Sequence, residues 1–196
     1  SVVSHDLRNP LNVADSRLEL AREECASDHL DDAVDAIGRS QALIDDLLTL
    51  AREGDDIGEV DRVALGDLVE ECWQTVETDA ATLQVRTEQT ILANESRLQQ
   101  ALENLVRNAV EHAGADVTVT VGSLADGFYV ADDGPGIPEG KRDRVFEAGH
   151  STLDGEGSLG LAIVERIVTA HGWDIRATES ESGGARFEIS GVETPD

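Results

Sequence analysis

Two asparagines and a histidine recur at every fourth position of the stretch ENLVRNAVEH. Asn104, Asn108 and His112 therefore lie along one edge of a predicted helix. The core side of this helix is formed by Leu98, Ala101, Leu105, Ala109 and Ala113. Asparagine is unfavourable inside helices because its amide competes for backbone hydrogen bonds, and its oxygen is a neutral ligand suited to Mg²⁺ beside a polyphosphate. The spacing indicates a metal–phosphate site, although this stretch taken alone is better explained by two surface asparagines.

Two glycine-bearing stretches follow the asparagines. In DDGPGIP, Asp132 ends a predicted strand, and its carboxylate can accept a hydrogen bond from an exocyclic amine such as N6 of adenine. Gly134 and Gly136 lack a Cβ, which allows positive φ and close approach to a flat ligand. In GHSTLDGEGSLGLAIV, glycines precede a helix whose free N–H groups suit a phosphate chain. Each motif is weak by itself, and the informative feature is their common order and spacing.

These motifs, taken in order, resemble those of the catalytic core of a sensor histidine kinase of a two-component system. SHDLRNPL resembles the H box, ENLVRNAVEH the N box, DDGPGIP the G1 box, VFEAG the F box and GEGSLGLAIV the G2 box. The match runs over essentially all 196 residues. The resemblance implies a dimeric helical hairpin that carries the phosphoacceptor histidine, joined to a Bergerat-type ATP-binding sandwich.

The resemblance also implies roles for individual residues. His5 would be the phosphoacceptor, Asp6 the neighbouring acid–base group, and Asn9 the residue that positions water for dephosphorylating the regulator. Asn104 and Asn108 would be the Mg²⁺ ligands, with Asn108 favoured. Residues 139–158 would form the mobile lid. The implied ATP-binding residues are Asn104, Asn108, His112, Asp132, Gly134, Gly136, Phe146, Gly157, Gly160 and Leu161.

The implied reaction is autophosphorylation of His5 by ATP with Mg²⁺, followed by phosphoryl transfer to an aspartate in the receiver domain of a response regulator. An imidazole is largely neutral at pH 7 and can attack the γ-phosphate. Two alternatives remain. A gyrase- or chaperone-type ATPase would carry a glutamate base where this chain has Asn104. A nucleotide-binding pseudokinase scaffold stays open because Ser158 replaces a glycine of the G2 box. Because the first helix begins only four residues before His5, we expect a weak helical bundle and hence a weak dimer for this piece of the protein.

Hydrophobic periodicity predicts the elements that position these residues. Apolar residues at alternating spacings of three and four in residues 1–53 predict two antiparallel helices. We expect their apolar stripe to pair with a second copy in a four-helix bundle, and the alternative is that the stripe packs on the following domain. Residues 54–62 are the expected linker, and residues 63–192 the catalytic ATP-binding domain. The expected class is α+β, with helices on one face of a mixed sheet. Helices are predicted at 65–76, 96–113 and 159–172, and strands at 83–88, 89–94, within 116–134, at 174–180 and at 185–190. Ser96 or Asn94 would cap the second of these helices.

Composition narrows the classes of partner. The chain has 41 acidic and 15 basic residues, for a formal net charge of -26, which argues against nucleic-acid binding. Lys141 is the only lysine, and such acidity is typical of soluble proteins adapted to high salt, as in haloarchaeal-type members of the family. Cys25 and Cys72 lack metal or disulfide motifs, which fits a reducing cytoplasm.

No run of the sequence is long and apolar enough for a transmembrane helix, and no signal peptide is recognisable. The sequence contains no methionine, even at position 1. We therefore expect a piece of a longer protein, whose missing N-terminal region would carry the sensor module and any membrane attachment.

Overall fold

The chain contains two compact units, residues 1–53 and 54–196. The computed structural model describes residues 57–75, 80–114, 116–146 and 160–195, together with six single positions of the first unit. These six positions are helical and half-buried: Ala14, Leu18, Ala21, Leu30, Ala33 and Ile37. Their helical state agrees with the two predicted helices, and the rest of the predicted hairpin lies outside the described residues.

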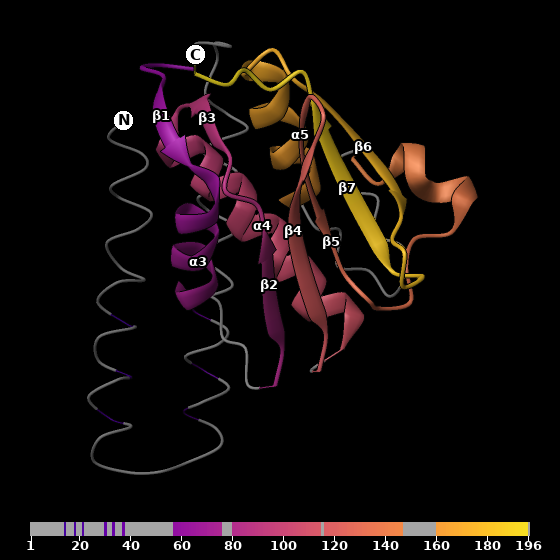
Figure 1. Ribbon diagram of the computed structural model, residues 1–196. Helices are drawn as coiled ribbons and strands as arrows, with labels where there is room; N and C mark the ends of the chain where they lie inside the picture. Colours follow the sequence, from indigo (N-terminus) through magenta and orange to yellow (C-terminus); the bar gives the residue numbers. More distant parts are fainter. Residues whose placement is uncertain are drawn as a thin grey trace. The chain divides into compact units, whose positions relative to one another are not determined.

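The second unit is built on a five-stranded mixed sheet (Figure 1). The strands, in spatial order, are β2 (Thr82–Arg86), β4 (Thr118–Leu124), β5 (Gly127–Ala131), β7 (Ala185–Ser190) and β6 (Asp174–Glu179). β2 runs parallel to β4, whereas the other neighbouring pairs are antiparallel. The predicted mixed sheet is therefore confirmed.

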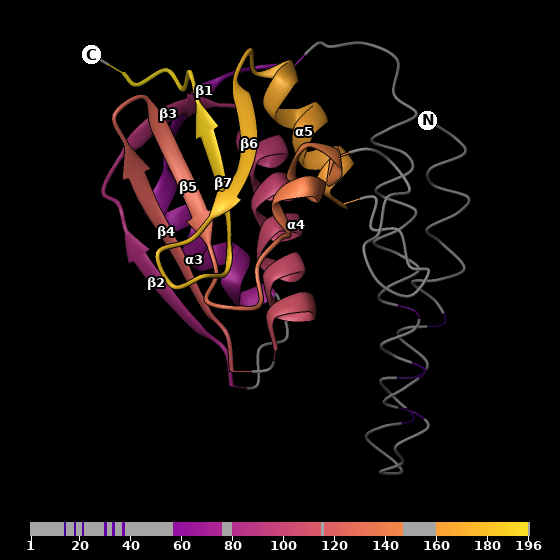
Figure 2. The same cartoon turned by 90° about the vertical axis from the view of Figure 1, so that its right-hand side faces the viewer.

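Three helices lie on the same face of this sheet (Figure 2). They are α3 (Leu65–Thr75), α4 (Glu95–Ala113) and α5 (Gly160–Ala170). α3 contacts β2, α4 contacts β5, α5 contacts β6, and α4 and α5 pack on each other. The 3₁₀ helix η1 (Glu139–Arg144) borders β6. Within the second unit, none of the described helices lies on the opposite face of the sheet.

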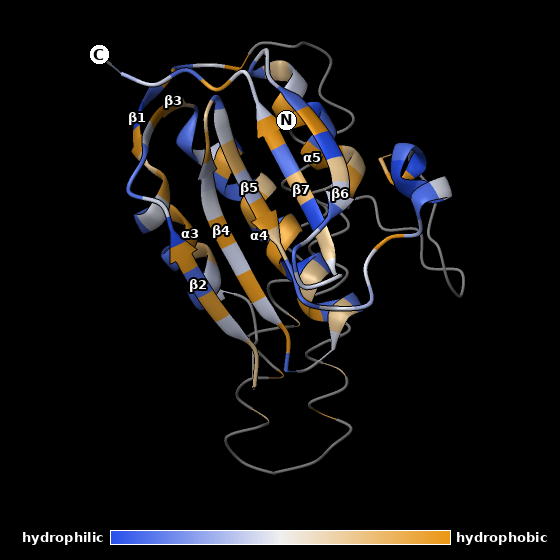
Figure 3. Cartoon of the chain, turned by 45° about the vertical axis from the view of Figure 1, so that its right-hand side comes forward, coloured by the Kyte–Doolittle hydropathy of each residue, from blue (hydrophilic) through white to orange (hydrophobic). Residues whose placement is uncertain are grey.

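The core lies between the helices and one face of the sheet. Buried residues alternate with more polar and less buried ones along β7 and over the first half of β4, which Figure 3 shows as bands along these strands. On β5, every residue except Tyr129 is buried. The largest buried side chains of this layer include Phe128, Phe187, Leu102, Leu105, Ile163 and Ile189. Burial of each such side chain stabilises the fold by about 1.5–3 kcal/mol.

A second, two-stranded sheet was not expected from the sequence. β1 (Asp61–Ala64) pairs antiparallel with β3 (Thr90–Ala93), so a strand begins inside the interval 54–62 that was expected to be linker. Only Val63 of β1 is buried, which leaves too little hydrophobic pattern for a prediction. β2 and β3 are adjacent in the sequence but belong to different sheets.

Candidate functional site

The polar residues along one edge of α4 become more exposed toward the C-terminal end of the helix. The cap of this helix is Asn94, whose Oδ1 accepts a hydrogen bond from the N–H of Arg97 at 3.1 Å. Asn104 is only 4% exposed, whereas Asn108 is half-buried and His112 is exposed. A surface position is therefore excluded for Asn104. On the core side, Leu98, Ala101, Leu105 and Ala109 are buried as predicted, and Ala113 is half-buried.

The amide of Asn104 is engaged through both of its polar atoms. Nδ2 donates to the carbonyl oxygen of Gln100 at 2.9 Å, and Oδ1 accepts from Nη2 of Arg107 at 2.9 Å. A metal ion at this oxygen would have to displace a guanidinium and lie beside its positive charge. Asn108, in contrast, makes no side-chain hydrogen bond with the described residues. The arrangement favours Asn108 over Asn104 as a metal ligand.

Asp132 follows β5 and is 8% exposed. Its Oδ1 accepts hydrogen bonds from the N–H groups of Gly134 at 2.9 Å and Ala185 at 3.0 Å. Burial raises the pKa of this carboxyl above its usual value, and the two N–H donors partly offset the effect. The second carboxylate oxygen accepts no hydrogen bond from the described part of the chain. That oxygen remains available for a donor such as an exocyclic amine.

The glycines after Asp132 allow the loop to approach protein backbone. A Cβ on Gly134 would come within 2.2 Å of the Cβ of Ala113, at the end of α4. Gly136 has φ of +71°, and its Cβ would come within 2.6 Å of the carbonyl oxygen of Gly183. The close neighbours of this loop are therefore the end of α4 and the β6–β7 turn, whereas the sequence suggested a flat ligand. The loop brings Asp132 to the end of the helix that carries Asn108 and His112.

The β6–β7 turn holds Asp132 from the other side, and sequence analysis missed its role. Ser180 Oγ donates to the carbonyl oxygen of Asp132 at 2.7 Å and accepts from the N–H of Gly184 at 2.9 Å. The N–H of Asp132 donates to the carbonyl oxygen of Ala185 at 2.9 Å. The sequence signal is the run SESGG between two strands, which indicates a turn but not its partner 48 residues earlier.

The expected lid begins with a segment anchored to the sheet. Arg142 of η1 donates to the carbonyl oxygen of Ile137 at 2.9 Å and forms a salt bridge of 2.9 Å with Glu179. Phe146 is buried and packs edge-to-face on Phe187, with ring centroids 6.2 Å apart. Gly160 and Leu161 begin α5 and are both buried. Phe146 is thus held in the core, and the predicted site residues Gly157 and Ser158 lie outside the described residues.

Two parts of the chain match known protein families. Residues 93–194, which contain α4, Asp132 and the β6–β7 turn, match the family described as histidine kinase-, DNA gyrase B- and HSP90-like ATPases. The chain belongs to this family. Residues 1–56 of the chain match the His Kinase A (phospho-acceptor) domain. The predicted residues His5, Asp6 and Asn9 fall in that match and lie outside the described residues.

Relatives of the chain include sensor proteins and sensor histidine kinases. The sensor protein IrlS of Burkholderia pseudomallei is 31% identical over 194 residues, covering 88% of this chain and 42% of IrlS. The sensor histidine kinase CpxA of Escherichia coli is 30% identical, covering 96% of this chain and 45% of CpxA. The crystal structure of full-length ShkA in complex with AMPPNP is similar with a TM-score of 0.69 and 31% identity, covering 99% of this chain and 45% of ShkA. The chain thus spans less than half the length of these relatives.

The described ranges contain no cluster of the side chains that most often bind metals. No group of three histidine, cysteine, aspartate or glutamate side chains there is placed to hold a metal ion. Asn108 of α4 is half-buried, and its amide oxygen is a neutral donor of the type that Mg²⁺ accepts beside phosphate and water oxygens. Within the same ranges, no helix combines the length and apolarity needed to cross a membrane.

Proposed function

We propose that this chain is the catalytic core of a sensor histidine kinase, which binds ATP in its second unit and phosphorylates His5 in its first. The observation that carries the proposal is the geometry of Asp132 at the end of α4. One carboxylate oxygen is fixed by two N–H donors and the other is available for the adenine amine. The match of the first 56 residues to a phosphoacceptor domain supports His5 as the acceptor.

The proposed reaction is an in-line phosphoryl transfer. An imidazole nitrogen of His5 attacks the γ-phosphorus of ATP, and the bond from that phosphorus to the bridging oxygen breaks. ADP leaves with the electron pair, and the imidazole proton passes to Asp6. The phosphoryl group then passes from His5 to an aspartate in the receiver domain of a response regulator. Asn9 would position the water that later removes it from the regulator.

In this proposal, the polar residues of α4 make different contacts around the phosphates. Asn108 would hold Mg²⁺, which supplies neutralisation of phosphate charge when bound. Asn104, although expected as a second metal ligand, would instead hold the guanidinium of Arg107 through its Oδ1. His112, exposed one turn beyond Asn108, would contact a phosphate. Gly157, Gly160 and Leu161 would line the phosphate side of the site.

The two units would have separate tasks. Residues 1–53 would form the dimerisation and phosphotransfer hairpin, and residues 63–192 the catalytic domain, with the linker between them. The division of the chain after residue 53 and the two family matches support these boundaries. Because ATP is supplied in the cytoplasm, the reaction would take place there. The acidic composition, with a single lysine, supports a haloarchaeal-type protein that works at high salt.

Incubation of the chain with ATP labelled at the γ-phosphate tests this function against its two alternatives. A kinase transfers the label to the protein. A gyrase- or chaperone-type ATPase releases it as inorganic phosphate, and a pseudokinase scaffold binds ATP and does neither. Label on the protein that depends on Mg²⁺ would support the proposal, and either other result would contradict it.

A further inference from the structure

A polar cavity lies on the face of the five-stranded sheet opposite to helices α3, α4 and α5. Its volume is about 240 Å³, and its lining comes from strands β2, β4, β5 and β7, the loop after β5 and the β6–β7 turn. Asn104, Asn108 and His112 of the proposed phosphate site on α4 are not among the lining residues, whereas Asp132 of the proposed adenine site borders the cavity at one end.

Small residues make the floor of the cavity, and large ones make its walls. Thr120 and Ala131 are cross-strand partners at its centre. On one side, Tyr129 lies flat over Gly122, where a Cβ would come within 2.5 Å of the tyrosine hydroxyl. The guanidinium of Arg186 stacks on this ring at 3.9 Å from its centroid. The hollow is therefore built by cross-strand packing.

One end of the cavity is cationic. Arg186 Nε donates to Glu188 Oε1 at 2.8 Å, and Arg176 Nε donates to the other oxygen of the same carboxylate at 2.7 Å. Two guanidiniums share one carboxylate, so this group keeps an excess positive charge. Arg86 of β2, which is paired with Gly122 of β4, adds a third guanidinium at this end, where it donates to Gln84 Oε1 at 2.7 Å.

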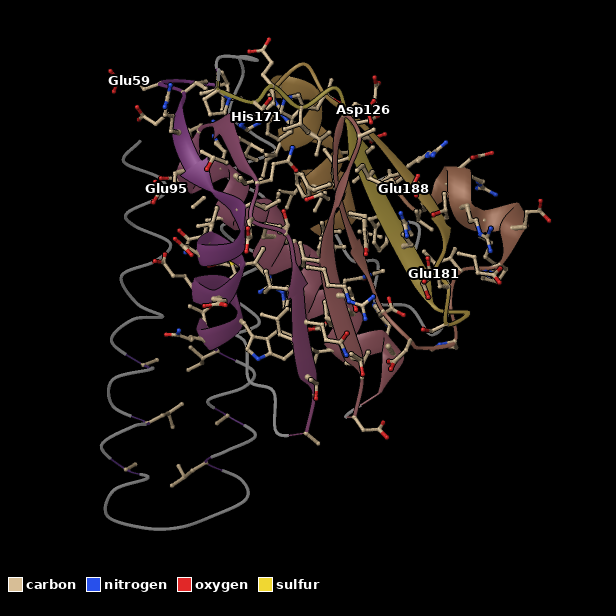
Figure 4. All side chains as sticks on the ribbon, in the orientation of Figure 1. Glu59, Glu95, Asp126, His171, Glu181 and Glu188 are labelled. Atoms are coloured by element: carbon tan, nitrogen blue, oxygen red, sulfur yellow. The ribbon has the colours of Figure 1, made fainter. Side chains whose placement is uncertain are left out.

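The other end is anionic. Asp133 accepts a hydrogen bond from the N–H of Thr118 at 2.7 Å, and this bond lowers the pKa of its carboxyl. Glu181 lies at the β6–β7 turn, at the end of β7 away from the shared carboxylate of Glu188 (Figure 4). Thr118, beside Asp133, and Gly122, beside Arg86, are four residues apart on β4, which corresponds to about 13 Å of strand. The cavity therefore offers opposite charges at its two ends.

We propose that this cavity binds a small zwitterion whose two charges are separated by several bonds, with its ammonium group at Asp133 and its carboxylate at Arg86 and Arg186. Bidentate pairing with guanidinium suits the carboxylate. An α-amino acid carries both charges on one carbon and does not span the two ends. The volume of about 240 Å³ lies below the roughly 300–1,000 Å³ of sites for drug-sized ligands, so a short chain fits better than a peptide.

Titration of the chain with 6-aminohexanoate, followed by calorimetry at constant ionic strength, tests the proposal. Hexanoate and hexylamine have the same chain length, and each lacks one of the two charges. We expect saturable binding of 6-aminohexanoate at least about tenfold tighter than that of either analogue. Equal binding of one analogue, or no saturable binding of any ω-amino acid with three to six carbons, would overturn the proposal.

Substitutions inside and outside the cavity test whether 6-aminohexanoate binds there. Arg86→Gln and Asp133→Asn should each weaken binding by about fivefold or more, because each removes one charge of the cavity. The asparagine keeps an oxygen that can accept from the N–H of Thr118, so the loop is retained. Arg62→Gln on exposed β1 removes an arginine that does not line the cavity and should leave affinity unchanged. Equal weakening by Arg62→Gln would show that only overall charge matters and would overturn the site.

Discussion

At the scale of single residues, replacement of the Asp132 carboxylate tests whether this side chain binds adenine. In Asp132→Asn, the side-chain oxygen can still accept from the N–H groups of Gly134 and Ala185. The side-chain NH₂ group would then face the adenine amine, and two hydrogen-bond donors would oppose each other. We expect the affinity for ATP, measured by calorimetry, to fall about tenfold or more, which corresponds to about 1.4 kcal/mol. Asp133→Asn is the matched control, because that side chain bonds to Thr118 and should leave ATP affinity unchanged. Unaltered affinity in Asp132→Asn would place adenine elsewhere.

The two asparagines of α4 should respond differently to alanine. Asn108 makes no side-chain hydrogen bond with the described residues, so Asn108→Ala should keep the stability of the fold while Mg²⁺-dependent autophosphorylation falls by roughly tenfold or more. Asn104→Ala removes two hydrogen bonds from a buried position and should lower the free energy of unfolding by about 1–3 kcal/mol. Denaturant unfolding and a labelled-ATP assay measure the two effects. Full Mg²⁺-dependent activity of Asn108→Ala would refute its role as the metal ligand.

At the scale of elements, Asn94 and His171 join three segments. Nδ2 of Asn94 donates to the carbonyl oxygen of Glu59 before β1 at 2.9 Å, and its N–H donates to Nε2 of His171, after α5, at 3.1 Å. Nδ1 of His171 contacts the carbonyl oxygen of Ile167 at 2.8 Å, and its ring stacks on Trp173. In Figure 4, Glu59 and His171 lie toward the same end of the domain. This geometry requires the neutral imidazole, with its proton on Nδ1.

Protonation of His171 should therefore weaken the fold. Burial, with a smaller effect of Arg97, lowers the pKa of His171 in the folded chain, so the folded state binds fewer protons than the unfolded state. The contribution is present above the unfolded pKa of about 6.5 and is lost as pH falls through the lowered folded pKa. Denaturant unfolding from about pH 7 to about pH 5 should show a steeper loss for the parent than for His171→Gln. His112→Gln, at an exposed site, should follow the parent, and parallel curves for parent and His171→Gln would contradict the assignment.

The elements differ in how far the sequence could predict them. α4 was predicted to within one residue at its start, because its apolar residues recur with helical periodicity and Asn94 provides a cap. β1 was not predicted because it buries a single side chain, Val63, and becomes a strand only by pairing with β3. The contact between Ser180 and Asp132 joins segments 48 residues apart, and no local pattern encodes such a pair. The opposite roles of Asn104 and Asn108 likewise depend on tertiary burial, which equal helical spacing does not reveal.

At the scale of the whole molecule, charge dominates behaviour in solution. With a net charge of -26, the acidic groups of the chain repel one another and also repel the polyanion ATP. As salt rises from ~0.1 M to ~1 M, the Debye length falls from about 10 Å to about 3 Å, and this repulsion is screened. We expect the melting temperature and ATP affinity to increase over this range of KCl. A melting temperature that stays flat or falls with added KCl would argue against adaptation to high salt.

The central claim is that His5 receives the phosphoryl group of ATP, and the stability of the protein-bound label tests it most directly. After incubation with labelled ATP, the parent should carry a label that is lost in acid and retained in alkali, as expected for a phosphoramidate and not for a serine phosphate ester. His5→Ala should bind ATP as tightly as the parent, because the proposed pocket belongs to the other unit, and should carry no label. A full acid-labile label on His5→Ala would contradict the account and would move the acceptor to His29, His112, His150 or His171.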